Sequence, residues 1–225
     1  MSEWLMEADC KSAGSAYGGS NPSLPMLGGY MEILNLFPTV VYKEQIEIPS
    51  GVSAAAKKEK YSRNGHNNGW LSATKKHLDD NYKPLVEIVD THVKLYMDHL
   101  KIEHELKCCG AWMNVHTGND WAQEHYHQNA MVSGIVYLEA PDGSGPIVFH
   151  PDKHLSFMFG PFFPMTDEYH MFKVDVKTGM ILLFPSTLSH SVYKNTKNVA
   201  RCSFAFDYMI KGKISTFLNE TTISS

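Results

Sequence analysis

The feature that most constrains the fold is a series of short apolar segments between residues 105 and 210. Seven of these segments are rich in β-branched and aromatic residues: 105–117, 131–140, 145–150, 170–176, 179–185, 190–195 and 200–210. Turn signals stand between several of them, namely PDGSG at 141–145, KTG at 177–179 and NTKN at 195–198. Short strands joined by such turns predict a β-sandwich, a jelly roll or a barrel.

Before these strands lies a segment whose apolar residues recur at the spacing of a helix and not at that of a strand. Within residues 81–103, apolar side chains recur at spacings of three and four: Leu85, Ile88, Val89, Val93, Tyr96, Met97 and Leu100. This pattern gives one apolar stripe and is typical of a helix that packs against a core. Pro84 falls in the first turn, where its missing N–H costs little. We therefore predict a supporting helix at about 81–103.

The N-terminal region has a composition of its own. Residues 1–30 are rich in Gly, Ser, Ala and Pro, which predicts a flexible tail. A residue pattern typical of a strand begins at Met31 and continues to Ile48. Met31 could itself be a start site. The predicted organisation is a tail over 1–30 and one domain over 31–225, with core strands at about 105–210.

Charge and cysteine usage exclude several classes of protein. The formal net charge is -4, so the chain lacks the basic field that binds nucleic acid. We find no apolar run of about 18 residues and no secretory signal, and we expect a cytoplasmic protein. The four cysteines form no CxxC pair, which favours reduced thiols over a zinc ribbon. The sequence leaves open whether the chain forms a homodimer.

Three of the twelve histidines suggest a metal site. His125 and His127 are two residues apart, so on a strand both would point to the same face. His190 follows an apolar strand and a turn, and a jelly roll brings such distant strands together. Three protein ligands that leave open positions suit an iron(II) oxygenase, whose usual set is two histidines and one carboxylate. Here His127 stands where that carboxylate is expected.

Arg201 adds a site for an anion eleven positions after His190. Its neighbours Ala200, Cys202, Phe204 and Phe206 are apolar, and a buried arginine is costly without a carboxylate partner. The guanidinium could hold the distal carboxylate of 2-oxoglutarate in a bidentate pair. Ser203, on the same strand face, could add a hydrogen bond, and the keto acid would then chelate iron beside His190.

Four segments together resemble a known family. HYHQNAMVSGIVYL, FHPD, GMILLFPSTLSHSVYKN and ARCSFAFDY are similar to segments of 2-oxoglutarate and iron(II)-dependent oxygenases found in marine bacteria and their phages. The resemblance spans about residues 33–210. It departs from the family pattern at Gln128, where proline is frequent.

The resemblance implies a fold and a set of site residues. The fold is a double-stranded β-helix, that is, a jelly roll of the cupin type. The implied iron ligands are His125 and His190, with His127 at the position where the wider superfamily has Asp or Glu. The co-substrate would be held by Arg201 and Ser203, and Asn114 is a further implied contact.

Other residues near these motifs are open to two interpretations. Ser133 and Tyr137 lie at even spacing from His127, so either hydroxyl could touch the co-substrate or be structural. Glu124 should face away from His125, and Asp152 is expected in a turn. Surface or turn positions are expected for His116, His150, His154 and His170. Residues 156–164 could be a lid or a packed loop, and 66–70 could border the site.

These features predict an enzyme that uses Fe(II), 2-oxoglutarate and O2. Oxidative decarboxylation to succinate and carbon dioxide would be coupled to hydroxylation of an unactivated C–H bond in a small molecule or a peptidyl residue. One alternative is a cupin-like three-histidine metalloprotein that does not use 2-oxoglutarate, although Arg201 and Ser203 would then lack a purpose. The other alternative is a non-catalytic jelly-roll binding module.

Overall fold

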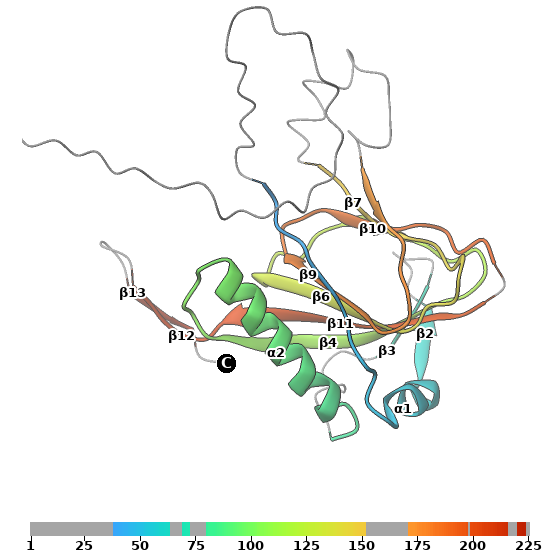
Figure 1. Cartoon of the computed structure of the whole chain (residues 1–225), viewed down its shortest axis with the longest axis horizontal. Coiled ribbons are helices and arrows are strands. Elements are labelled where there is room, and N and C mark those ends of the chain that lie inside the picture. The colour runs from blue at the N-terminus through green and yellow to red at the C-terminus, as the bar shows by residue number, and fades with distance from the viewer. Residues whose placement is uncertain are drawn as a thin grey trace, which may run out of the picture. The chain divides into compact units, whose positions relative to one another are not determined.

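The computed structural model describes residues 38–63, 69–72, 80–151, 171–197, 199–215 and 220–223, with only the main chain for 70–72, 213–215 and 220–223. Residues 39–225 group into one compact unit (Figure 1). The predicted tail over 1–30 lies outside the described residues, so its boundary stays a prediction. Among the described residues, no helix is long and apolar enough to cross a membrane.

Two helices and thirteen strands make up the described part of the chain. In chain order they are β1 (Tyr42–Gln45), α1 (Val52–Lys58), β2 (Tyr61–Arg63), β3 (Trp70–Ser72), α2 (Lys83–His99), β4 (Leu106–His116), β5 (Ala122–His125), β6 (Val132–Glu139), β7 (Ile147–Phe149), β8 (Phe172–Val174), β9 (Met180–Pro185), β10 (His190–Val192), β11 (Arg201–Ile210), β12 (Gly212–Ser215) and β13 (Glu220–Ile223).

The strands form two antiparallel sheets and a separate hairpin. The larger sheet has the order β1-β9-β6-β11-β4-β3-β2, and the smaller has the order β5-β10-β7-β8. Strands β12 and β13 pair only with each other. Most neighbours in the two sheets are distant in the sequence, as in a double-stranded β-helix, and solved structures share this arrangement, which confirms the predicted fold class.

Helix α2 covers the outer face of the large sheet (Figure 1). Its buried side chains, at the predicted spacing, are Leu85, Val89, Val93, Tyr96 and Met97. The helix ends at His99, earlier than predicted, because Lys101 takes the left-handed conformation with φ 57°. Hydrogen bonds from Ile102 N to Met97 O at 3.0 Å and from Lys101 N to Asp98 O at 3.1 Å complete a Schellman motif.

Strand β11 lies in the large sheet, which separates two hydrophobic clusters of the described residues. Alternate residues Phe204, Phe206 and Tyr208 are buried in the core beneath α2. The Phe206 ring crosses β6 at Gly134, where a Cβ atom would overlap it. The opposite face of β11 carries Arg201, Ser203, Ala205 and Asp207, and we call it the inward face. It looks into the space between the two sheets, so side chains from distant motifs can meet there.

Candidate metal and co-substrate site

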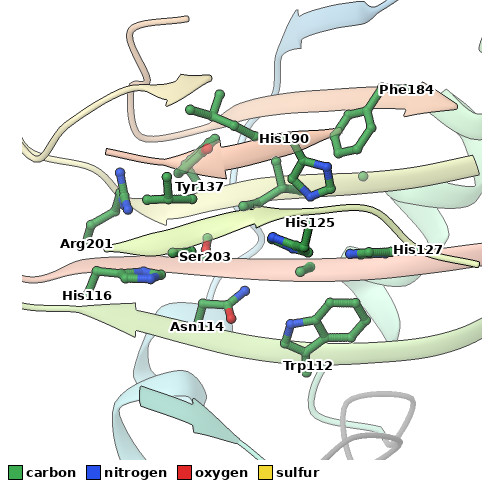
Figure 2. A pocket seen from close by; sticks show the side chains of 16 residues that line it. Trp112, Asn114, His116, His125, His127, Tyr137, Phe184, His190, Arg201 and Ser203 are labelled. Carbon is green, nitrogen blue, oxygen red and sulfur yellow. The ribbon is translucent and has the colours of Figure 1, made fainter. Parts of the chain in front are cut away.

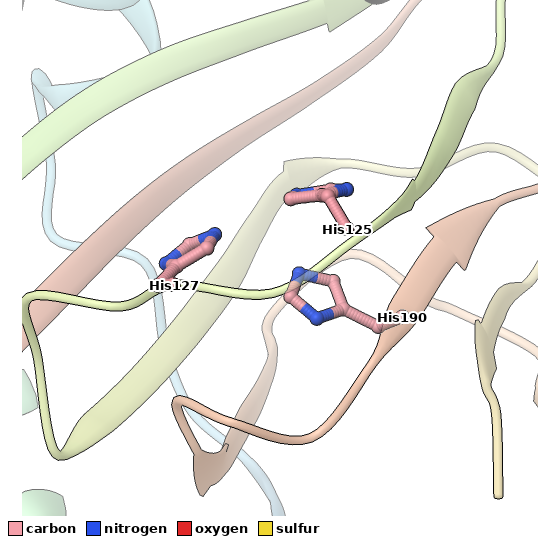
Figure 3. A group of neighbouring side chains, drawn as sticks. All are labelled: His125, His127 and His190. Carbon is pink, nitrogen blue, oxygen red and sulfur yellow. The ribbon is translucent and has the colours of Figure 1, made fainter. Parts of the chain in front are cut away.

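The three histidines of the predicted metal site lie together (Figure 3). His125, at the end of β5, and His190, at the start of β10, are cross-strand partners with ring centroids 4.3 Å apart. The ring of His127 stacks on that of His125 at 5.4 Å. One ring nitrogen from each residue can be chosen so that all three lie within 4.8 Å of one another.

The reason for this proximity differs from the prediction. Strand β5 ends at His125, so His127 does not share a strand face with it. Instead, the backbone N–H of His127 donates to the carbonyl of Ser186 at 2.8 Å, which fixes the chain just after the strand. The pairing expected from strand alternation is therefore produced by a loop tied to the end of β9.

Each of the three rings has its Nδ1 atom in a hydrogen bond. His125 Nδ1 lies 2.8 Å from the carbonyl of Gln123, and His190 Nδ1 lies 2.9 Å from the carbonyl of Leu188. A carbonyl only accepts, so both Nδ1 atoms carry the proton and both Nε2 atoms are free to bind a metal. His127 Nδ1 lies 2.6 Å from Oδ1 of Asp207. This carboxylate oxygen accepts, so Nδ1 of His127 also carries the proton and its Nε2 atom is also free to bind a metal.

The electrostatics also favour neutral rings. Burial, followed by the nearby His125, lowers the pKa of His190 to about 3. Burial likewise lowers the pKa of His125. A neutral imidazole is the form that binds a metal ion.

A cavity of about 230 Å³ connects these histidines to Arg201 (Figure 2). Its lining includes the whole of the predicted site: His125, His127, His190, Asn114, Tyr137, Arg201 and Ser203. Figure 2 shows Arg201 at one end of the cavity and His127 at the other. The volume is below that of a pocket for a drug-sized molecule, and it suits a small metabolite.

The Arg201 end holds polar atoms that no described residue satisfies. Arg201 is 1% exposed, and its Nη1 donates to the carbonyls of Ser144 at 3.1 Å and Gly145 at 2.7 Å. Its Nη2 atom and the Tyr137 hydroxyl have no hydrogen-bond partner within the described part of the chain. Burial raises the pKa of Tyr137 to about 12 and lowers the pKa of Arg201, whose guanidinium stays cationic.

The expectation that His116 is a surface or turn histidine is wrong. His116 is 5% exposed, lines the cavity and is the cross-strand partner of Arg201. Strand β4 puts Trp112, Asn114 and His116 on one face at alternate positions, and that face is inward. Burial, followed by the Arg201 charge, lowers the pKa of His116 to about 3. Its Nδ1 is a third unpartnered atom at this end.

The remaining candidates fall outside the cavity or outside the described residues. Glu124 accepts a hydrogen bond from Ser189 at 2.7 Å, away from the metal site as predicted. His150 hydrogen-bonds to Ser191 at 2.8 Å. Those that the structure does not describe are Asp152, His154, residues 156–164, His170 and residues 66–68. Buried Gly69 lies against His116, since a Cβ there would be 2.8 Å from Nε2.

Sequence reasoning missed three residues that shape the histidine end. Asp207 bonds to His127, the Trp112 ring lies 5.6 Å from that of His127, and the Phe184 ring lies 4.8 Å from that of His190. Asp207 could have been found, because it stands at even spacing from Arg201 and Ser203 in ARCSFAFDY. No comparable pattern in the sequence indicates Trp112 or Phe184.

Comparison with protein families agrees with this arrangement. A family described as "Putative 2OG-Fe(II) oxygenase" matches residues 110–207, which include both ends of the cavity. Over this segment the chain resembles the 2OG-Fe(II) oxygenase family, and solved oxygenase structures share its fold. A search of curated proteins returned no match.

Solved structures share the fold at low sequence identity. A prolyl-4-hydroxylase from Pseudomonas putida is 13% identical with a TM-score of 0.55, over 77% of this chain and 94% of the other. HygX from Streptomyces hygroscopicus, solved with nickel and 2-oxoglutarate, is 14% identical with a TM-score of 0.56, over 76% and 83%. The epimerase SnoN, solved with Fe3+ and α-ketoglutarate, is 13% identical with a TM-score of 0.57, over 76% and 79%.

Proposed function

We propose that the chain is an iron(II)- and 2-oxoglutarate-dependent dioxygenase that hydroxylates an unactivated C–H bond. Iron(II) with 2-oxoglutarate would supply the oxidising chemistry, with release of succinate and carbon dioxide. His125, His127 and His190 would hold the metal. Arg201 and Ser203 would hold the distal carboxylate of the co-substrate, with Asn114 and Tyr137 beside it.

One observation carries this proposal. A single small cavity joins three histidines with free Nε2 atoms to a buried guanidinium that has no carboxylate partner among the described residues. A cation in that position is costly unless an anion reaches it. A ligand with a chelating keto acid at one end and a carboxylate at the other matches both ends of the cavity.

The donors at the Arg201 end fit such an anion. Nη2 of Arg201 and the hydroxyl of Tyr137 are buried and unpartnered, and both can donate to a carboxylate oxygen. Ser203 is the cross-strand partner of both Asn114 and Tyr137, so its hydroxyl lies within the same group. These residues would orient the co-substrate and fix its distance from the histidines.

The walls of the cavity support a role in excluding water. Ile135, Ile147, Phe184 and Ala205 are among the apolar residues that line it. Apolar walls strengthen the electrostatic contacts inside and limit access of bulk water to the reacting atoms.

The prime substrate is proposed only as a class, a small molecule or a peptidyl side chain. Relatives of this fold include a prolyl-4-hydroxylase and an epimerase, so the reaction outcome varies among them. We favour hydroxylation over halogenation, because halogenation needs an open position at the place that His127 occupies.

The test combines spectroscopy with product analysis. Addition of iron(II) and 2-oxoglutarate under anaerobic conditions should give the weak visible charge-transfer absorption of a chelated keto acid, and air should then release succinate. Arg201→Lys should weaken both signals. The matched control is Arg63→Lys, the same exchange at the chain's other arginine, which pairs with Asp120 outside the cavity lining.

The outcomes separate the alternatives. Metal binding without the absorption or succinate would favour a three-histidine metalloprotein of another chemistry. Absence of metal binding as well would favour a binding module without catalysis. Equal effects of the two arginine exchanges would contradict the assignment of Arg201.

A further inference from the structure

Asp207 is the one carboxylate that touches the histidine cluster among the described residues. Its Oδ1 atom lies 2.6 Å from His127 Nδ1 and accepts a hydrogen bond from Ser133 Oγ at 2.6 Å. The Ser133 and Ser186 hydroxyl oxygens are 2.9 Å apart. Because Ser133 has one proton, donating it to Asp207 leaves Ser133 to accept from Ser186. A three-residue network thus ends on the carboxylate behind His127.

The sheet places Asp207 for this contact. It is the fourth inward residue of β11 after Arg201, Ser203 and Ala205, and it is the cross-strand partner of Ser133. The pairing of β11 with β4 is irregular between Asp207 and Tyr208. The Asp207 and His127 side chains are 18% and 16% exposed, so water screens their interaction only in part.

His127 differs from the other two histidines in how its ring is held. His125 and His190 each bond through Nδ1 to the carbonyl of the residue two positions earlier, and both lie at strand ends. His127 lies beyond β5 and has no such local acceptor. The Nδ1 atom of His127 is therefore held by the side chain of Asp207 from β11, whereas the Nδ1 atoms of His125 and His190 are held by nearby backbone carbonyls.

A carboxylate has an effect that a carbonyl lacks. It fixes the tautomer of the ring, and its charge makes the imidazole a stronger donor to a metal. A set of three neutral histidines neutralises none of the charge of a divalent cation, whereas the usual carboxylate ligand neutralises one unit. Asp207 brings one negative charge to the site through its hydrogen bond to His127, without being a metal ligand itself.

We propose that Asp207 is a positioning residue that holds His127 in the Nδ1–H tautomer and supplies, through that ring, the negative charge missing from the all-histidine set. The inference rests on the proposed function for the identity of the metal. The geometry of the His127–Asp207 pair is independent of it.

The first test needs no metal. Nitrogen-15 NMR of the full, metal-free chain at a pH of about 8, where an ordinary histidine is neutral, reports the tautomer of each ring. We expect the Nδ1–H form at His127 in the wild type and a shift toward the Nε2–H form in Asp207→Leu, with a smaller change in Asp207→Asn. His125 and His190 should not change, and they serve as internal controls.

The second test measures affinity for Co(II), a divalent probe that imidazole sites bind. Asp207→Asn should weaken binding by about 10- to 100-fold, as expected for a hydrogen-bonding partner of a ligand. Ser133→Ala should weaken it less. The matched control is Asp90→Asn, because Asp90 bonds to Tyr208, the next residue of β11, from the opposite face.

The results of the two tests distinguish failure of the Asp207 inference from failure of the proposed function. The wild-type tautomer in Asp207→Leu, together with wild-type Co(II) affinity in Asp207→Asn, would overturn the inference and leave the proposed function standing. An oxygen ligand from Asp207 in the Co(II) spectrum of the wild type would also overturn it, since Asp207 would then bind the metal itself. Failure of the wild type to bind Co(II) or iron(II) would instead remove the proposed function, and the charge role of Asp207 with it. A thermal unfolding curve shows whether each variant is folded.

Discussion

The two ends of the inward face of β11 are built in opposite ways. At the His127 end, every Nδ1 atom of the three histidines has a hydrogen-bond partner within the protein. At the Arg201 end, the residues that line the cavity carry buried polar atoms without a partner among the described residues, namely Arg201 Nη2, His116 Nδ1 and Tyr137 OH. Buried polar atoms are rarely left unpaired, which supports the proposal that a ligand binds at the second end.

The two ends would therefore contribute to ligand binding in different ways. The histidine end is preorganised by the protein, because fixed Nδ1 bonds leave the Nε2 atoms free before any metal arrives. Under the proposed function, the arginine end completes its hydrogen bonding when the carboxylate of the co-substrate binds.

Loss of one histidine should have the largest effect. His190→Ala removes the ring that pairs across the sheet with His125, and we expect Co(II) affinity to fall by more than about 100-fold, beyond the loss from an outer partner. Titration of the metal-free protein measures this. His150→Ala, an exchange just outside the cluster, should leave the affinity unchanged, and a similar loss in both variants would refute the assignment.

Loss of the Arg201 guanidinium should weaken co-substrate binding and leave metal binding nearly unchanged. We expect Arg201→Ala to weaken 2-oxoglutarate binding by about 100-fold or more, since the loss of one member of a buried charge pair costs about 3–5 kcal/mol. Co(II) affinity should stay within a few-fold of the wild type. Calorimetric titration with each ligand tests the separation, which a parallel fall in both affinities would contradict.

His116 should make the metal-free protein sensitive to acid. Its pKa is about 3 in the folded chain and about 6.5 when unfolded, so between these values the unfolded chain binds a proton that the folded chain does not. Its contribution is present above pH of about 6.5 and is lost toward pH of about 3, at about 1 kcal/mol per pH unit.

In His116→Gln this dependence should disappear. Urea unfolding of the wild type and the variant at a series of pH values compares the two slopes. The variant should lose less stability than the wild type as the pH falls below about 6. Identical slopes would show that His116 does not carry the effect.

Removal of a single hydroxyl should have the smallest effect. Ser203→Ala removes one hydrogen bond at the Arg201 end, worth about 1 kcal/mol, and we expect 2-oxoglutarate affinity to fall by about fivefold. Ser191→Ala changes a hydroxyl that bonds to His150, outside the cavity lining, and provides the control. An unchanged affinity in Ser203→Ala would remove Ser203 from the co-substrate site.

Much of the fold could be predicted, because it depends on patterns that the chain repeats locally. The seven predicted strands all contain observed strands, and the apolar stripe of α2 is the buried one. Strand β5 was not predicted, since its sequence AQEH has little β character and pairing with β10 determines it. The end of α2 depends on Lys101 in the left-handed conformation, which the residue type does not indicate.

The candidate site could be predicted where alternation along one strand was enough. Arg201 and Ser203 share the inward face as expected, and Asn114 lies across from Ser203. His116 and Asp207 were missed, because their roles depend on which strands become neighbours and in which register. Register between strands distant in the sequence is a tertiary property, and local patterns specify it weakly.

A comparison of 2-oxoglutarate with glutarate, which has the same two carboxylates and no keto group, tests directly whether one ligand binds both the histidine end and the Arg201 end of the cavity. Calorimetry should be done with and without Co(II). We predict that Co(II) strengthens 2-oxoglutarate binding by at least about tenfold and leaves glutarate binding nearly unchanged, because only the keto acid reaches the metal as a chelate. Equal binding of the two diacids, whether or not Co(II) is present, would contradict the account.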